Sequence, residues 1–142
     1  MEGQTIALWK DQSYIGKFES NTVFLRLKKQ EYMEYHFAES LEDALRYLKE
    51  HEAVLVFFSD ESCNVGDALS PKLQNMLKEH FDKMDFLEIN VQMIPEARGH
   101  FNIFVIPSVL VYFDGRESIR QARHVNPTGL AREIDRLYAL FF

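Results

Sequence analysis

The sequence predicts a three-layer α/β/α sandwich around a mixed sheet, and three observations support that prediction. From residue 40 onward, the apolar periodicity alternates between helical and strand-like in the order α-β-α-β-α-β-β-α. The short apolar runs at 53–58 and 85–91 are typical of strands buried on both faces. Asp114-Gly115 is a strong indicator of a tight hairpin, which adds an antiparallel pair to a sheet otherwise built by parallel crossovers.

The first two helices are indicated by their starts and by their apolar faces. Ser40 and Asp43 resemble a capping box and predict a helix over about 40–51. A second helix should follow Cys63, and Pro71 falls inside it, where the missing N–H predicts a kink. One side of this second helix is apolar: Leu69, Leu73, Met76, Leu77 and Phe81.

The C-terminal elements follow from turn and cap residues. Pro95 is placed to start a short helix over 95–101, because proline is favoured at the first helical position. A strand over 108–113 and a return strand over 117–123 flank the hairpin turn. Asn126-Pro127 then predicts the cap of a last helix.

The chain is predicted to form one domain over 33–142 with an N-terminal extension over 1–32. Alternating apolar residues at 23–27 and at 33–37 indicate one or two strands, one of which should supply the first strand of the sheet. Aromatic residues gather in this part of the chain. They serve either core packing or a surface for a partner or a homodimer: Trp9, Phe18, Phe24, Tyr32, Tyr35 and Phe37.

Composition excludes several classes of function. A formal net charge of −6 and a pI of about 5.3 argue against nucleic-acid binding. No apolar run approaches the roughly 18 residues of a membrane span, and the first residues lack the features of a signal peptide. One cysteine cannot form an internal disulfide, so we expect a cytoplasmic protein. The sequence contains no dinucleotide or phosphate-binding fingerprint that would indicate a cofactor, and the five histidines show no zinc-site spacing with the cysteine.

Three motifs, in order, resemble the thioredoxin family over about residues 33–142. Cys63-Asn64-Val65-Gly66 lies where that family has its C-x-x-C motif, between a central strand and a helix. Pro71 occupies the place of the family's helix-kinking proline. Ile106-Pro107, followed by a strand and a hairpin, resembles its cis-proline loop. The resemblance implies a thioredoxin-like fold and an active site at Cys63.

Three positions depart from the family pattern. Gly66 replaces the second cysteine, Ser62 replaces the usual aromatic residue before the first, and Phe57 replaces the buried acid. In the family, that acid assists proton transfer involving the second cysteine. The two losses are therefore consistent with each other, since a buried carboxylate is costly.

The resemblance leads to two hypotheses of function. In the first, Cys63 is a monothiol nucleophile whose partners are protein thiols and disulfides or glutathione; it attacks a disulfide to form a mixed disulfide, while Ile106 and Pro107 shape the partner groove. In the second, the fold is a non-catalytic protein-interaction module and Cys63 is dispensable. A purely structural cysteine is the third reading, because lone cysteines are often buried apolar residues. No cofactor is expected in any of them.

The electrostatic setting of Cys63 is mixed. A helix N-terminus lowers the pKa of a thiol, whereas nearby carboxylates raise it, so a moderately activated thiol is expected. The acidic neighbours along the chain are Asp60, Glu61 and Asp67. His124 follows the return strand and is either a base for Cys63 or an exposed histidine before the last helix.

Overall fold

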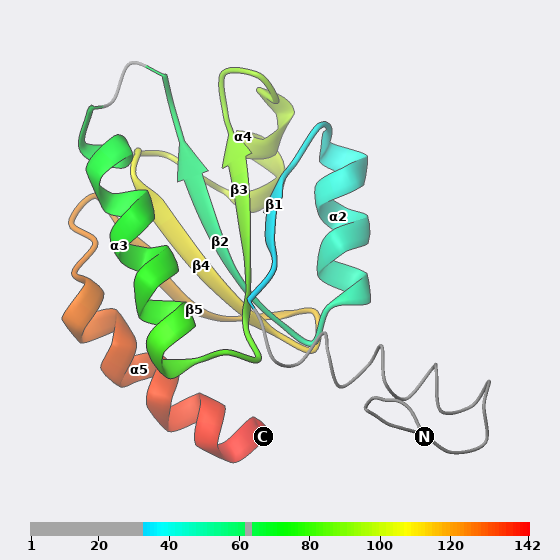
Figure 1. Ribbon diagram of the computed structural model, residues 1–142. Helices are drawn as coiled ribbons and strands as arrows, with labels where there is room; N and C mark the ends of the chain where they lie inside the picture. The colour runs from blue at the N-terminus through cyan, green and yellow to red at the C-terminus, as the bar shows by residue number, and fades with distance from the viewer. Residues whose placement is uncertain (1–32, 62–63) are drawn as a thin grey trace, which may run out of the picture. The chain divides into compact units, whose positions relative to one another are not determined.

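A computed structural model describes residues 33–61 and 64–142, with the backbone alone for 64–67, and the expectations about residues 1–32 lie outside it. Met33–Phe142 forms one compact unit. Its elements run along the chain as β1 (Tyr35–Phe37), α2 (Leu41–Glu50), β2 (Ala53–Ser59), α3 (Asn64–His80), β3 (Asp85–Asn90), α4 (Glu96–Phe101), β4 (Ser108–Phe113), β5 (Arg116–Ala122) and α5 (Pro127–Phe141) (Figure 1).

The five strands form one mixed sheet in the order β1-β3-β2-β4-β5. β1, β3 and β2 are parallel, whereas β4 pairs antiparallel with β2 and β5 antiparallel with β4. The parallel strands place their C-terminal ends at one edge of the sheet, and antiparallel β4 begins at that same edge. The predicted fold class is therefore confirmed, with β1 as the strand supplied by the alternating residues at 33–37.

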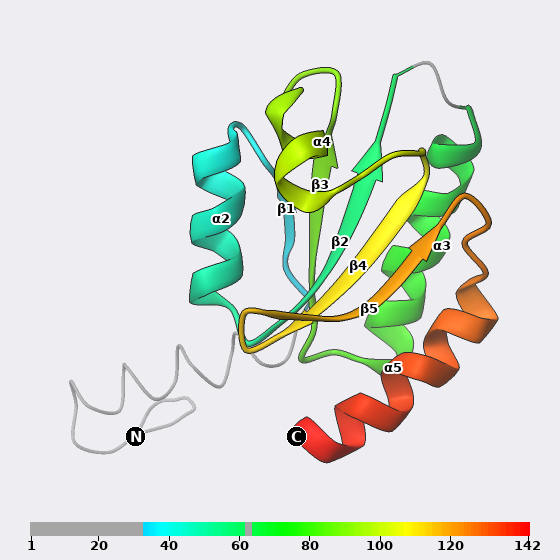
Figure 2. The same ribbon diagram turned by 180° about the vertical axis from the view of Figure 1, so that it is seen from behind.

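Helices cover both faces of the sheet. α3 and α5 lie on one face, and α2 and α4 lie on the other (Figures 1 and 2). Side chains alternate across a strand, so β2 sends Leu55 and Phe57 toward α3 and α5, and Val54, Val56 and Phe58 toward α2 and α4. Because both faces are covered, the apolar runs are continuous, as the sequence indicated. In the part of the chain that the structure describes, no helix combines the length and the apolar character that a bilayer crossing requires.

The start of α2 shows the predicted cap with one difference. Ser40 Oγ accepts a hydrogen bond from the Asp43 N–H at 3.0 Å. The Asp43 carboxylate in turn accepts from the Glu39 N–H at 2.9 Å, one residue before the amide that a capping box would engage. Partial burial opposes ionisation of Asp43, but the Glu39 amide and His36 outweigh it and lower the pKa of this carboxyl.

The turn between β4 and β5 has the geometry that Asp114-Gly115 predicts. Phe113 and Arg116 are cross-strand partners, and the two residues between them have φ angles of 54° and 78°. Positive φ at both central residues is the type I′ arrangement. β5 ends one residue earlier than expected, because Arg123 adopts a left-handed φ of 69° and leaves the strand.

This turn yields a prediction with a matched control. Gly115→Ala is expected to lower the free energy of unfolding by about 1 kcal/mol, since a Cβ is disfavoured at positive φ although no heavy atom lies within 4 Å of it. Gly99→Ala, at an exposed position of α4 that is equally free of contacts, should raise the free energy of unfolding by about 0.5–1 kcal/mol through helix propensity. Urea unfolding of the two variants measures whether the free energy of unfolding falls in Gly115→Ala and rises in Gly99→Ala. Equal effects at both sites would contradict the backbone explanation.

Candidate functional site

The predicted motif lies at the C-terminal edge of the parallel strands. β2 ends at Ser59 and α3 begins at Asn64, so the backbone of Asn64, Val65 and Gly66 forms the first turn of α3. Cys63 itself lies outside the described residues. The expectation that the N-terminus of this 17-residue helix favours a Cys63 thiolate therefore stays a prediction.

The Ile106–Pro107 loop begins β4 at the same edge of the sheet. The peptide bond between the two residues is cis. Ser108 Oγ donates to the Val105 carbonyl at 2.7 Å, and the Pro107 carbonyl accepts from the Arg123 N–H at 2.9 Å. Among the described residues, the backbone N–H and C=O of Ile106 take no hydrogen bond. A half-buried segment thus presents one unpaired backbone donor and one acceptor at the rim of the sheet.

Arg120 of β5 anchors the segment that leads into this loop. Its guanidinium donates to the carbonyls of Phe101 and Asn102, at the end of α4, at 2.8 and 3.0 Å. The same group donates to both carboxylate oxygens of Glu117 at 2.7 and 2.9 Å. Carbonyls at a helix C-terminus lack partners within the helix, so this contact satisfies them and holds the start of the loop.

A groove of about 350 Å³ lies beside Pro107. Three basic side chains border it: Lys72, Arg123 and His124. The structure thus brings Pro107 and His124, which are separate in the sequence, to one groove. Its remaining lining comes from the start of α3 and from the segment that precedes α5: Ala68, Leu69, Val125, Asn126 and Pro127.

Backbone and side-chain bonds fix the segment that carries the groove's arginine and histidine. The His124 N–H donates to the Ala122 carbonyl at 2.8 Å. The Asn126 N–H donates to Gln121 Oε1 at 3.2 Å, and Asn126 Oδ1 caps α5 by accepting from Thr128 and Gly129. The predicted Asn126 cap is confirmed, and it holds this wall of the groove.

The charges around the motif differ from those that the chain order suggested. Asp60, which was expected to oppose a thiolate, has a carboxylate oxygen 3.8 Å from the Arg98 guanidinium of α4. Lys72 and Arg123 add positive charge at the neighbouring groove. Sequence reasoning missed all three cations, because none of them is close to Cys63 along the chain and each is brought to this edge by the fold.

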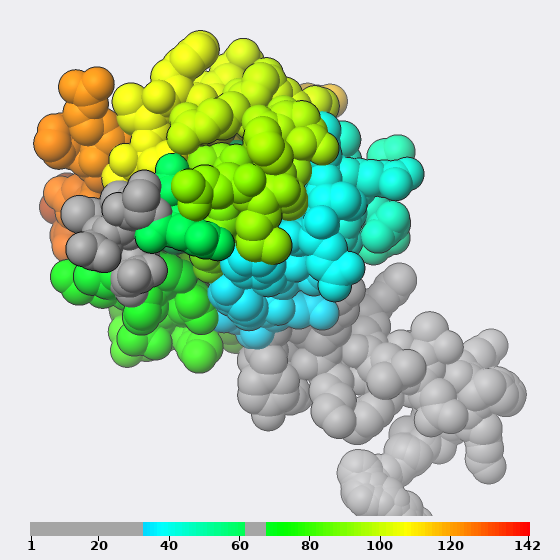
Figure 3. Space-filling model, turned by 90° about the horizontal axis from the view of Figure 1, so that it is seen from above, coloured from blue at the N-terminus to red at the C-terminus, as the bar shows by residue number. Residues whose placement is uncertain are grey.

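Sequence reasoning also missed two exposed apolar side chains at this edge. Phe104 is 85% exposed in the loop before β4, and Met93 is 57% exposed in the loop after β3. Figure 3 views the domain from this end, with the segment before β4 in yellow beside the lime-green α4 region. The run Ile-Phe-Val-Ile before Pro107 has the composition of a buried strand, so its sequence contains no indication that Phe104 is solvent-facing.

Comparisons with known proteins cover most of the domain over residues 33–142. The Thioredoxin family model matches residues 31–136. Thioredoxin-like protein YdfQ of Bacillus subtilis is 30% identical over 102 residues, which cover 72% of this chain and 90% of that protein. A thioredoxin of Buchnera aphidicola is 36% identical over 69 residues, 48% of this chain and 63% of that protein. The solved Plasmodium falciparum thioredoxin aligns with a TM-score of 0.64 at 23% identity, covering 71% of this chain and 97% of that one.

Proposed function

Because this chain belongs to the thioredoxin family, we propose that it is a monothiol thiol–disulfide redox protein with Cys63 as its nucleophile. Cys63 is the only cysteine in 142 residues, and Gly66 stands where a second motif cysteine would be. This cysteine count is the observation on which the monothiol mechanism rests, since an internal resolving step requires two thiols.

The reaction with glutathione disulfide is a simple exchange. The Cys63 thiolate attacks one sulfur, the S–S bond of glutathione disulfide breaks, and one glutathione thiolate leaves and takes up a proton. A new disulfide joins Cys63 to the other glutathione. A second glutathione thiol reverses this step and releases Cys63. The cytoplasm, the compartment expected from the cysteine usage, is a reducing environment that contains glutathione.

Two features of the groove support this partner class. The unpaired backbone N–H and C=O of Ile106 suit an extended peptide that would hydrogen-bond to the backbone beside Pro107. The basic side chains Lys72, Arg123 and His124 border the same groove and suit the two carboxylates of glutathione. In this proposal, His124 contributes positive charge or accepts the proton of the thiol.

Incubation of the full chain with glutathione disulfide, followed by intact mass measurement, tests the proposal. One glutathione adduct per chain is expected, reversible by reduced glutathione and absent in Cys63→Ser. Lys72→Gln should slow adduct formation by about twofold to fivefold, the effect of one exposed charge. Lys78→Gln, on the same helix but away from the groove, should react at the wild-type rate.

Exposed Phe104 and Met93 favour the second candidate, a non-catalytic interaction module. These apolar side chains lie at the same end of the sheet as the unpaired backbone groups of Ile106. Together they offer contacts to a protein partner whose binding requires no thiol chemistry. The mass experiment separates the two functions. A wild-type chain that remains unmodified by excess glutathione disulfide would overturn the monothiol proposal and leave the interaction module.

A further inference from the structure

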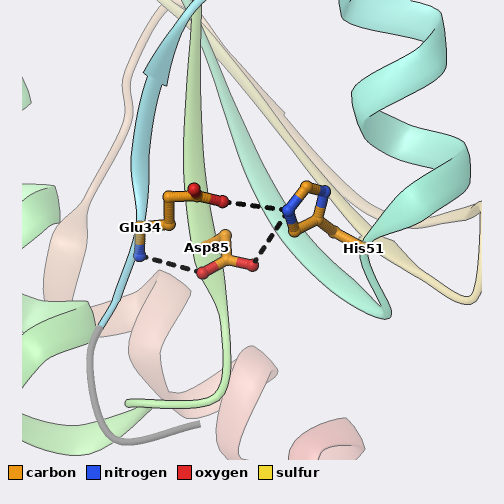
Figure 4. A group of neighbouring side chains, drawn as sticks. All are labelled: Glu34, His51 and Asp85. Carbon is orange, nitrogen blue, oxygen red and sulfur yellow. Dashed lines mark hydrogen bonds and ion pairs between the residues drawn. The ribbon is translucent and has the colours of Figure 1, made fainter. Parts of the chain in front are cut away.

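A second cluster of chemical groups lies at the opposite end of the sheet from Pro107. Glu34 precedes β1, His51 caps the C-terminus of α2, and Asp85 is the first residue of β3 (Figure 4). Glu34 and Asp85 are 51 positions apart, and β1–β3 pairing brings them together. The sequence predicted no metal site, because the zinc pattern sought there pairs histidine with cysteine. This cluster instead joins one histidine to two carboxylates that strand pairing brings together.

The His51 ring is held with one nitrogen facing the carboxylates. Its Nδ1 lies 2.9 Å from the Tyr47 carbonyl, and because a carbonyl only accepts, Nδ1 carries the proton of that bond. The ring stacks on Tyr47 at 3.8 Å between centroids, and its side chain is only 7% exposed. Nε2 is thereby aimed at Glu34 and Asp85. A backbone carbonyl on the far nitrogen is the usual support of a metal-binding histidine.

The distances suit a small tetrahedral ion. His51 Nε2 lies 2.9 Å from Glu34 Oε1 and 4.0 Å from Asp85 Oδ2, and one ligand atom from each residue lies within 4.8 Å of the others. Ligands about 2.0 Å from a tetrahedral zinc ion are about 3.3 Å apart, so shifts of less than about 1 Å in exposed Glu34 and in the Asp85 carboxylate would complete the geometry.

Outer contacts orient both carboxylates. Asp85 Oδ1 accepts the Glu34 N–H at 2.9 Å, which turns Oδ2 toward His51. The Tyr47 hydroxyl donates to Glu34 Oε1 at 3.0 Å. Because a carboxylate only accepts, the Tyr47 hydroxyl is the donor in this bond and fixes the position of Glu34 Oε1.

We propose that Glu34, His51 and Asp85 form a binding site for a divalent transition-metal ion, with Zn²⁺ as the best match and water as the fourth ligand. One imidazole nitrogen and two carboxylate oxygens suit Zn²⁺ better than Mg²⁺ or Ca²⁺, which prefer oxygen-only sites. A bound ion would tie β1, α2 and β3 together at the edge remote from the groove. The rival arrangement is a proton on Nε2, which gives a His–carboxylate ion pair and no metal affinity.

Cobalt titration of the chelator-treated full chain tests the proposal, because Co²⁺ absorbs visible light when it replaces Zn²⁺. We expect one equivalent of Co²⁺ to give tetrahedral visible bands, and one equivalent of Zn²⁺ to abolish them and raise the melting temperature. His51→Gln and Asp85→Asn should each weaken binding by at least about 100-fold, since even outer-shell changes cost 10–100-fold. Glu34→Gln alters a half-exposed side chain, so it should fold and still weaken binding at least about 10-fold.

His36→Gln is the matched control. His36 Nε2 also lies 2.8 Å from a carboxylate oxygen, Oδ2 of Asp43, but no second carboxylate within residues 33–61 and 64–142 is paired with it, and Asp43 also pairs with Arg46 at 3.2 Å. This variant should bind Co²⁺ as the wild type does. Absence of visible bands in the wild-type chain would overturn the proposal and leave the ion pair. Wild-type affinity in Glu34→Gln and His51→Gln would also overturn it, since the ion would then bind elsewhere.

Discussion

Phe57→Asp is expected to remove most of the stability of the domain. Phe57 lies in the middle of β2, fully buried in the cluster beneath α3 and α5, with its ring 6.2 Å from that of Phe86. Truncation of a buried phenylalanine costs about 3–5 kcal/mol, and an unpaired buried carboxylate adds several more. Domains are stable by only about 5–15 kcal/mol. Urea unfolding followed by circular dichroism measures the loss.

The pH dependence of Phe57→Asp distinguishes the charge from the cavity. Burial raises the pKa of the introduced carboxyl above its unfolded value, so its folded form favours the proton. The charge-dependent part of the destabilisation should therefore decrease as the pH falls from the raised folded-state pKa toward about 4, the unfolded value, and should be absent below it. Phe57→Leu is the control: it removes part of the ring volume without adding a charge, so its cost should be smaller and independent of pH. A loss below about 2 kcal/mol in Phe57→Asp at neutral pH would contradict the dry environment assigned to this position.

Gly66→Cys is expected to convert the chain from a monothiol to a dithiol reductant. The wild-type chain should show little turnover in a dithiol-dependent disulfide reduction assay, because its mixed disulfide can be resolved only by a thiol from another molecule. Cysteines at positions 63 and 66 would have the C-x-x-C spacing of the family, and the second would resolve the mixed disulfide internally. We expect turnover to rise at least about tenfold, with the gain limited by Phe57, which cannot accept the proton that the second thiol must lose before it attacks.

The control for this gain is the double variant Cys63→Ser, Gly66→Cys, which has a single thiol in the other place and should be inactive. Mass measurement before and after alkylation should count two thiols in reduced Gly66→Cys and none after its oxidation. Substantial wild-type turnover in the same assay would refute the single-thiol mechanism. No gain in a correctly folded Gly66→Cys would show that the motif no longer supports disulfide exchange.

Local chemistry predicted most of the fold correctly. The cap at Ser40, the proline inside α3, the Asp114-Gly115 turn and the Asn126 cap all appear where the sequence placed them. The small errors fall at element ends. Pro95 caps α4 rather than occupying its first turn, and β5 ends at Ala122. That strand end depends on the Arg123 N–H, which donates to the Pro107 carbonyl at 2.9 Å and is therefore governed by a residue distant in the sequence.

The sequence by itself determined the order of helices and strands and the presence of a single cysteine, Cys63. These features depend on periodicity and on residues a few positions apart, which one chain displays directly. The tertiary structure alone decided which charges meet: Asp60 with Arg98, and His51 with Glu34 and Asp85. Strand pairing and helix packing bring together residues that are far apart in the sequence. A local sequence pattern contains no information about which of these residues come close in space.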